Sequence, residues 1–419
     1  MYDVPDKRVQ NDTCISSDER ENRVTEVQPK GNVPALRFPE FSGEWMIKTI
    51  NDLATVIGGG TPDTTIKSYW DGNIQWFTPS EIGKSKYINL SSRTITEEGL
   101  KNSSAKLLPP YTILLSSRAT VGECSITLQE CATNQGFQSL IAKSCDIDFL
   151  YYLIQTKKKD LIRKACGSTF LEISANEVRK IHTNVPSNAE QKKIGALLSL
   201  VDNRIEVQNK IIEDLKKLKS AISKQVFTQE PNGWSRLDTL FSKGKGGGTP
   251  TSTNKEYYNG EIPFLSINDI TKQGKYVRYT ENHLSQSGLK NSSAWVVPKY
   301  SLIMSMYASV GLVTINEIPI TTSQAMFAMQ LKDKGLLDYL YYYLSYFKYR
   351  YIHKYLETGT QSNINADVIR GIMIPTYGYS RNMEIASTLQ GIDVKIDNEL
   401  SVLKLFNRQK NYLLSHMFI

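Results

Sequence analysis

The sequence predicts an α+β protein in which two mixed α/β domains follow one another and are joined by two long helices. Two observations predict this fold: a long internal duplication, and a heptad pattern that follows each of the two copies. We expect the helices to pair as an antiparallel coiled coil, which gives the molecule an approximate two-fold symmetry.

The duplication consists of identical segments at a nearly constant offset. The Gly-Gly-Gly-Thr-Pro segment at residues 58–62 recurs at residues 246–250. The seven residues at 99–105 recur unchanged at 288–294. The period is far too long for a solenoid, so it indicates two copies of a whole domain.

Each copy has the same internal order. It opens on Trp45 or Trp234, passes through the Gly-rich loop and short alternating strands, and reaches a helix rich in Tyr and Leu before a last strand ends in Pro. We therefore expect the following parts: a flexible N-terminal arm at 1–39, domains at 40–187 and 230–380, and long helices at 188–229 and 381–419.

The heptad seam of the first long helix has its counterpart 191 residues later, and only two seam positions are polar in each helix. They are Gln208 and Lys219 in the first and Glu399 and Lys410 in the second. Polar seam residues fix register at a cost in stability. The antiparallel register that keeps the other layers apolar pairs Gln208 with Lys410 and Lys219 with Glu399.

Composition excludes several classes of protein. Hydrophobic residues make up 40% and charged residues 22%, which is enough apolar material for sizeable cores. No apolar run approaches the roughly 18 residues of a membrane helix, and the polar N-terminus does not resemble a secretory signal. Five cysteines without a CxxC spacing predict reduced thiols in a cytoplasmic protein rather than disulfides or a zinc site. The net charge of +8 permits a polyanionic partner without requiring one.

Several motifs resemble the specificity subunit of type I restriction–modification systems. They are the Gly-rich loop, Trp-Phe-Thr-Pro-Ser-Glu-Ile at 76–82, Ser-Arg-Ala-Thr-Val-Gly at 117–122, Asn-Gln-Gly at 134–136 and Glu-Gln-Lys-Lys-Ile at 190–194. The resemblance covers residues 40–419. It implies that the two domains are target-recognition domains, each reading one half of a bipartite site in double-stranded DNA.

The resemblance also implies partners. Two methyltransferase subunits would dock on the helices, which set the spacer between the half-sites, and two motor-nuclease subunits can join the complex. S-adenosylmethionine, ATP and Mg²⁺ would belong to those partners, and this chain would bind no cofactor or metal and have no catalytic residues. The second copy has Met306-Tyr307 where the first has Ser117-Arg118, so we expect the half-sites to differ and the target to be asymmetric.

The candidate DNA contacts are loop residues with amides, hydroxyls, a guanidinium or free backbone N–H groups. Plain turns, a surface ion pair at Arg118 and solvated loops are the alternatives for these positions. In the first copy the candidates are Gly60, Thr61, Ser80, Lys101, Asn102, Ser117, Arg118, Thr120, Asn134, Gln135, Ser168 and Thr169. In the second copy they are Gly248, Thr249, Asn268, Lys290, Asn291, Tyr307, Ser323, Gln324, Thr360, Gln361 and Asn363.

The sequence gives little support to an enzyme, while a third kind of function stays possible. An amino-methyltransferase needs an Asn or Asp before its Pro-Pro-aromatic block, whereas Leu108 precedes Pro109-Pro110-Tyr111. The four histidines are scattered, which does not favour a metal enzyme. A DNA-binding or protein-interaction scaffold that works without restriction partners remains open, and co-purification with a methyltransferase would separate it from a specificity subunit.

Overall fold

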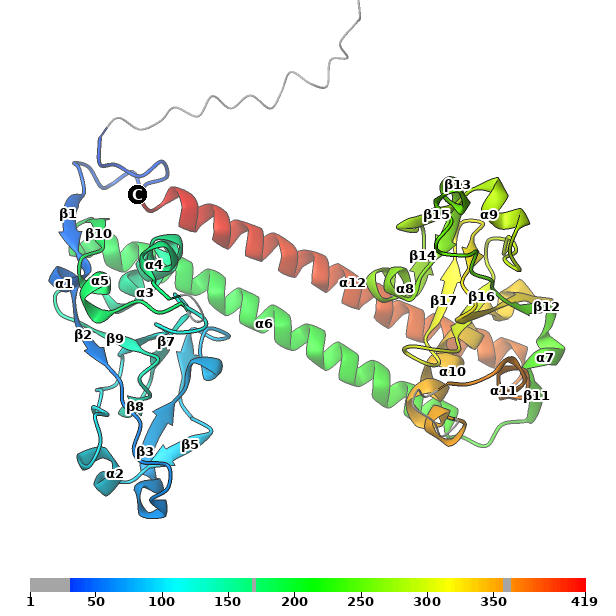
Figure 1. Cartoon of the computed structure of the whole chain (residues 1–419), viewed down its shortest axis with the longest axis horizontal. Coiled ribbons are helices and arrows are strands. Elements are labelled where there is room, and N and C mark those ends of the chain that lie inside the picture. Colours follow the sequence, from blue (N-terminus) through cyan, green and yellow to red (C-terminus); the bar gives the residue numbers. More distant parts are fainter. Residues whose placement is uncertain (1–30, 168–170, 357–362) are drawn as a thin grey trace, which may run out of the picture. The chain divides into compact units, whose positions relative to one another are not determined.

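A computed structural model describes residues 31–167, 171–356 and 363–419 of the chain. The chain divides into two compact units. Unit 1 comprises Met1–Ile205 with Leu405–Ile419, and unit 2 comprises Glu206–Lys404. Each unit therefore contains one α/β domain together with part of each long helix, α6 (Asn188–Phe227) and α12 (Tyr379–His416) (Figure 1).

The domain of unit 1 contains three sheets. The largest has the strand order β2-β9-β6-β7-β4, the second has the order β5-β3-β8, and β1 pairs with β10. Both larger sheets are mixed, because β4 runs parallel to β7 and β3 runs parallel to β8. The elements in chain order are β1 (Met46–Thr49), α1 (Ile50–Leu53), β2 (Ala54–Gly58), β3 (Trp70–Phe77), β4 (Tyr87–Ile88), β5 (Arg93–Ile95), α2 (Glu97–Lys101), β6 (Ile113–Leu115), β7 (Cys124–Thr127), β8 (Cys131–Thr133), β9 (Gln138–Ala142), α3 (Ile147–Thr156), α4 (Lys158–Lys164), α5 (Ala175–Arg179) and β10 (His182–Val185).

The domain of unit 2 repeats this topology strand for strand. Its sheets have the orders β12-β19-β16-β17-β14, β15-β13-β18 and β11-β20. This confirms the predicted duplication of a mixed α/β domain. The elements are β11 (Gly233–Arg236), α7 (Leu237–Leu240), β12 (Phe241–Gly246), β13 (Tyr258–Leu265), α8 (Ile267–Gln273), β14 (Tyr276–Val277), β15 (Asn282–Leu284), α9 (Gln286–Lys290), β16 (Leu302–Ser305), β17 (Val313–Asn316), β18 (Thr321–Thr322), β19 (Met326–Leu331), α10 (Leu337–Arg350), α11 (Ala366–Arg370) and β20 (Met373–Thr376).

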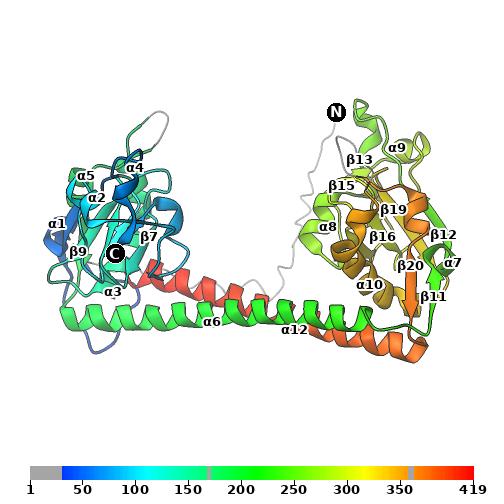
Figure 2. The ribbon, with the colours of Figure 1, turned by 90° about the horizontal axis from the view of Figure 1, so that it is seen from below.

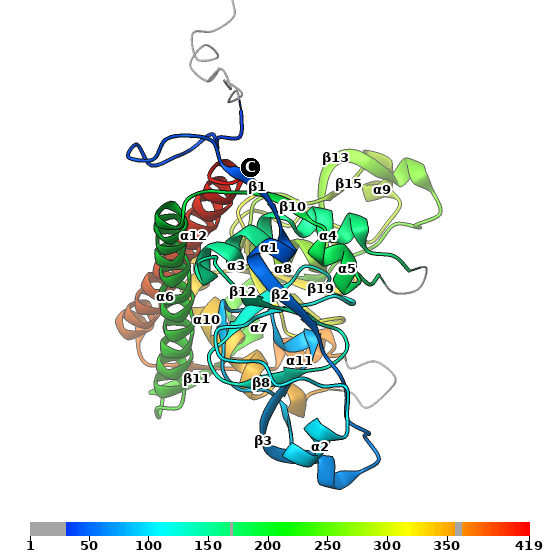
Figure 3. The same cartoon turned by 90° about the vertical axis from the view of Figure 1, so that its left-hand side faces the viewer.

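In each unit one apolar helix fills the space between the large sheet and the long helices. In unit 1 this helix is α3, whose Phe149 and Leu153 share a core with Ile113 of β6 and with Ile194 and Leu198 of α6 (Figure 3). In unit 2, α10 has the corresponding place beside α12 (Figure 2). Each fully buried aliphatic or aromatic side chain contributes about 1.5–3 kcal/mol to folding. Each domain is therefore held firmly to the helices within its own unit.

The long helices run antiparallel, but the predicted facing pairs were wrong. Within unit 2, Gln208 donates to the backbone oxygen of Glu399 at 3.1 Å and to its carboxylate, and Lys219 pairs with Asp393 at 2.5 Å. Within unit 1, Lys410 pairs with Asp202 at 2.7 Å. Neither lysine takes the partner expected for it, because each pairs with an aspartate beside the seam. Lys410 thereby gains a full negative charge in place of the neutral Gln208, and Gln208 meets Glu399 instead.

The N-terminal segment is anchored before residue 39. Arg37 binds Glu190 at the start of α6 through two hydrogen bonds of 2.8 Å, and the N–H of Leu36 donates to the carbonyl of His416. The side chains of Leu36 and Phe38 pack against the core of unit 1. The expected flexible arm therefore does not extend to residue 39.

Candidate nucleic-acid interface

Three repeated segments of the first domain meet in one place. The N–H of Gly60 donates to the carbonyl of Thr133 at 2.8 Å, which ties the Gly-rich loop to the Asn-Gln-Gly loop. The same glycine lies directly against Ser104 and Ala105 at the end of the seven-residue motif. Segments that are far apart in the sequence are thus neighbours in the fold.

The loop that contains Ser117 and Arg118 also contacts these segments. The N–H of Ser117 donates to the carbonyl of Gly136 at 2.8 Å, and the N–H of Ile173 donates to the carbonyl of Ser117 at 3.0 Å. We call the resulting cluster of loops the motif junction. In unit 1 it consists of residues 58–62, 102–105, 116–118 and 133–136.

Unit 2 builds the same junction with different side chains. The N–H of Gly248 donates to the carbonyl of Thr322 at 2.9 Å, and the N–H of Met306 donates to the carbonyl of Ala325 at 2.7 Å. Ile364, which follows Asn363, donates its N–H to Met306 at 3.1 Å. The junction of unit 2 consists of residues 246–250, 291–294, 305–307 and 322–325.

Packing explains why the loops need glycine. A Cβ on Gly59 would lie 2.0 Å from the carbonyl oxygen of Asn134, and one on Gly60 would lie 2.3 Å from the Ser104 hydroxyl. Gly248 faces Ser293 in the same way at 2.3 Å. Because the N–H groups of Gly60 and Gly248 are buried and bonded to carbonyls, neither is available to a phosphate. Contact of these two residues with DNA could therefore not use their N–H groups, and it stays a prediction.

The seven-residue motif is also retained for structural reasons. Asn102 donates its side-chain amide to the carbonyl of Glu98 at 3.0 Å, and Asn291 donates to the carbonyl of Ser287 at 2.9 Å. Each of these carbonyls also accepts the backbone N–H of the same asparagine, so Asn102 and Asn291 cap the C-terminal ends of α2 and α9 with two hydrogen bonds each. Lys101 and Lys290, in the last turns of these helices, remain exposed and can approach an anion.

A threonine and a glutamine pair up in each junction and supply some of its exposed polar groups. The Thr61 hydroxyl donates to the side-chain oxygen of Gln135, which leaves the amide NH₂ of Gln135 facing outward from an exposed side chain. In unit 2 the N–H of Gln324 approaches the Thr249 hydroxyl at 3.5 Å, and both side chains are exposed. Such amides can bind base edges, above all adenine.

Arg118 forms an ion pair with Glu172 at 2.8 Å, with its side chain 43% exposed. The alternative of a surface ion pair is therefore present, and the guanidinium still has donors directed to solvent. Tyr307 of unit 2 is 41% exposed next to the corresponding loop position. Ser117 is buried, and its hydroxyl lacks a hydrogen-bond partner among the described residues. Its contact with DNA stays a prediction.

The remaining candidates have varied surroundings. Asn134 and Ser323 accept hydrogen bonds from N–H groups two residues ahead of them and shape their own loops. The Thr120 hydroxyl contacts that of Ser116, and the Ser80 hydroxyl contacts that of Thr78. Asn268 donates to Glu281 at 3.0 Å outside the junction. Four predicted contacts lie outside the described residues: Ser168, Thr169, Thr360 and Gln361.

Sequence reasoning missed several charged residues. Glu172 was not recognised as the partner of Arg118, and Arg93 was not placed over the ring of Trp70, 3.6 Å from its centre. Two buried lysines, Lys86 and Lys275, were also missed. Their offset of 189 residues, equal to that of the motifs, was the signal that could have identified the lysines.

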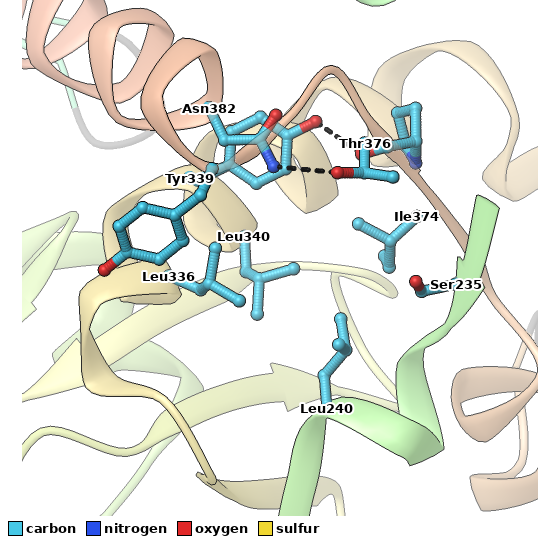
Figure 4. Close-up of a pocket in the computed structure, with 10 residues that line it drawn as sticks. Ser235, Leu240, Leu336, Tyr339, Leu340, Ile374, Thr376 and Asn382 are labelled. Atoms are coloured by element: carbon cyan, nitrogen blue, oxygen red, sulfur yellow. Dashed lines mark hydrogen bonds between the residues drawn. The ribbon is translucent and has the colours of Figure 1, made fainter. Parts of the chain in front are cut away.

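A separate small pocket of about 180 Å³ lies in unit 2 near the start of α12 (Figure 4). Asn382 donates to the Thr376 hydroxyl at 3.4 Å on its rim, and Tyr339 donates to the carbonyl of Pro375 at 2.6 Å. None of the predicted DNA contacts lines it. The lining residues are Ser235, Leu240, Leu336, Tyr339, Leu340, Ile374, Pro375, Thr376, Tyr379 and Asn382.

Potential metal ligands do not gather in the described part of the chain. Among residues 31–167, 171–356 and 363–419, three or more His, Cys, Asp or Glu side chains nowhere come together to hold a metal. Burial raises the pKa of Cys124, Cys131 and Cys145 to about 12, so these thiols stay protonated. Within the same residues, no helix is both long and apolar enough to cross a membrane.

Comparison with known proteins identifies relatives. The sequence model described as "Type I restriction modification DNA specificity domain" matches residues 42–217 and 231–403. The chain is 35% identical over 256 residues to the type I restriction enzyme MjaIX specificity subunit of Methanocaldococcus jannaschii, covering 55% of this chain and 59% of that protein. It is 29% identical over 188 residues to the EcoR124I/EcoR124II specificity subunit of Escherichia coli, covering 43% and 45%. The matches thus span about half the length of these curated relatives.

Solved structures share the fold. The S subunit of a type I restriction–modification system from M. genitalium superposes with a TM-score of 0.58 at 17% identity, covering 92% of this chain and 99% of that one. A chain from a study of complex assembly and conformational transition of the type I R-M system has the same TM-score at 16% identity, covering 88% and 96%.

Proposed function

The chain belongs to the type I restriction–modification DNA specificity family, and on that premise we propose that it is the specificity subunit of a type I complex. It binds double-stranded DNA, and each α/β domain reads one half of a bipartite target. The observation that carries this proposal is the motif junction, which has the same backbone in both units. The same backbone with two different sets of exposed side chains suits the recognition of two different half-sites.

The side chains that differ between the junctions support an asymmetric target. Arg118 suits guanine, whose two acceptors it can bind together, whereas Tyr307 of unit 2 offers a ring and one hydroxyl. Asn134 likewise has Ser323 as its counterpart. Two junctions with these differences would bind two different base sequences.

The long helices supply a surface for protein partners. On α6 within unit 2, Val207, Ile211 and Leu218 are 39–58% exposed and recur at spacings of four and seven residues, which places them on one face. An exposed apolar stripe of this kind suits docking of an amphipathic helix. We assign it to the methyltransferase subunits, of which we expect two, and two motor-nuclease subunits can complete the assembly.

In this proposal the chain itself is not catalytic. S-adenosylmethionine would be bound by the methyltransferase subunits, and ATP and Mg²⁺ by the motor-nuclease subunits. We expect the complex to act in the cytoplasm, where it meets both host and foreign DNA.

The experiment that tests the proposal has two readouts. The full chain is expressed together with a type I methyltransferase subunit from the same host, and the modified bases of the host DNA are then mapped. We expect the two proteins to co-purify and the modified adenines to define one bipartite motif. DNA binding without a methyltransferase partner would instead favour a stand-alone scaffold, and methyl transfer by this chain alone would favour an enzyme.

A further inference from the structure

A chain of polar contacts joins the domain of unit 1 to both long helices. Lys86 pairs with Asp148 of α3 at 2.6 Å and approaches the Tyr152 hydroxyl at 3.4 Å. That hydroxyl donates to Asp202 of α6 at 2.6 Å. Lys410 of α12 then pairs with the second oxygen of Asp202 at 2.7 Å. Three parts of the fold thus meet in one network.

Unit 2 contains the same network, with the roles of the long helices exchanged. Lys275 pairs with Asp338 of α10 at 2.7 Å and donates to the Tyr342 hydroxyl at 3.0 Å. Tyr342 donates to Asp393 of α12 at 2.9 Å, and Lys219 of α6 pairs with Asp393 at 2.5 Å. Each long helix therefore supplies an aspartate to one unit and a lysine to the other.

Because both lysines are buried, loss of their polar partners would be strongly destabilising. The side chains of Lys86 and Lys275 are only 7% and 10% exposed, so each ammonium group needs a partner within the protein. Burial lowers the pKa of Lys275, and the hydrogen bond with Asp338 opposes that effect. A buried charge that loses its partner is strongly destabilising, so such a network tolerates little displacement.

The network is sensitive to the position of the helices. A slip of one residue along α6 would move Asp202 by about 1.5 Å and turn it by about 100°, away from both Tyr152 and Lys410. A base pair of duplex DNA rises about 3.4 Å. A slip of roughly two residues therefore corresponds to one base pair of spacer.

We propose that these two Lys–Tyr–Asp–Lys networks are the positioning device that fixes where each recognition domain sits on the helix pair, and thereby the spacer length that the protein accepts. The inference rests on the proposed function. It assigns the positioning role to residues that lie away from the motif junction, so they would affect the distance between half-sites without changing the bases that are read.

The test uses the full chain in complex with its methyltransferase. Methylation rates are measured on DNA carrying the mapped half-sites with the native spacer and with one or two base pairs added or removed. The variants are Lys219→Met and Tyr342→Phe, which remove one charge and one hydroxyl. Lys219→Arg keeps the charge, and Lys217→Met alters an exposed lysine of the same helix whose ion pair, among the described residues, is with Glu213.

We expect the preference for the native spacer over spacers one base pair longer or shorter to fall about tenfold in Lys219→Met and Tyr342→Phe, the size of effect that loss of one strong hydrogen bond gives. Lys219→Arg and Lys217→Met should keep the wild-type profile. If Lys219→Met does not fold, Tyr342→Phe alone decides the test, because it preserves the ring packing.

Variants that methylate the native site with an unchanged spacer profile would overturn the positioning role. A general loss of methylation at all spacers, with the profile unchanged, would also overturn it, because this result indicates a merely structural contribution. If the wild-type complex methylates no bipartite site, the proposed function fails, and this inference fails with it.

Discussion

Within the motif junction, some residues pack the loops together and others lie at the exposed edge. Gly59 and Gly60 leave no room for a Cβ, and Asn102 satisfies a helix end, so these residues build the loop platform. Thr61 and Gln135 lie at the edge of that platform. Retention of a motif in both copies thus reflects the packing of these loops, and we propose that recognition depends on the exposed side chains that they carry.

A glycine pair in one loop gives a matched test of this division. Gly60→Ala should destabilise the domain by about 2–4 kcal/mol, because its Cβ would clash with backbone and side-chain atoms. Gly58→Ala should change stability by less than about 1 kcal/mol, since the nearest atom to its Cβ is 3.7 Å away. Denaturant unfolding of both variants measures the difference. Equal stabilities would contradict the packing role of Gly60.

A substitution of Arg118 tests whether the junction of unit 1 reads bases. The wild-type protein should bind its target more tightly than DNA that is altered in the half-site read by the domain of unit 1. Arg118→Ala should reduce this difference in binding free energy by about 1–3 kcal/mol. The control is Arg163→Ala in the same domain, whose side chain is 77% exposed and pairs with Asp160. Fluorescence anisotropy with the two DNA duplexes measures both variants. An Arg118→Ala protein that discriminates as well as wild type would exclude a base-reading role.

At the scale of residues, the sequence identified the loops but did not show which of their residues are buried, paired or exposed. Most candidates lie in or beside the junctions because duplicated motifs were followed. Whether Ser117 is buried or Arg118 is paired depends on Glu172 and on neighbouring loops, which come together only in the folded chain. Long-range neighbours of this kind leave no local pattern to read.

At the scale of elements, the long helices likewise could be predicted from a local pattern, whereas the contacts between them could not. Heptad spacing predicted both helices, because an apolar seam is a local periodic signal. Their antiparallel orientation was predicted from a register in which the polar seam residues face one another. The facing pairs were wrong because only seam positions were considered. Asp202 and Asp393 flank the seam and compete for the lysines. Gln208 and Glu399, which are equivalent residues of the two copies, then meet each other.

The contact between Gln208 and Glu399 predicts a dependence on pH. Hydrogen bonds from Lys395 and Gln208 lower the pKa of Glu399 from its ordinary value of 4.5. Because the folded-state pKa is the lower one, the carboxylate stabilises the protein above about pH 4.5 and loses that effect as the pH falls through the folded-state value.

Thermal unfolding of wild type and Glu399→Gln across this range measures the effect. Wild type should be the more stable at neutral pH, and the two midpoints should converge as the pH falls below about 4.5. A gap between the midpoints that stays constant with pH would show that the carboxylate charge plays no part.

For the whole molecule, duplication made the fold predictable. Two identical segments at one offset indicated two domains, and the matching sheet orders of the two units confirm them. The position of each domain on the helices could not be predicted in this way. It depends on buried groups such as Lys86 and Lys275, which resemble ordinary surface lysines in the sequence.

The central claim is that each domain reads its own half of a bipartite DNA target. Replacing residues 233–380 with the second domain of another specificity subunit, followed by mapping of methylated adenines, tests this claim most directly. We predict that one half of the motif changes while the other half and the spacer length stay as they were. A motif that changes in both halves, or in neither, would contradict the account.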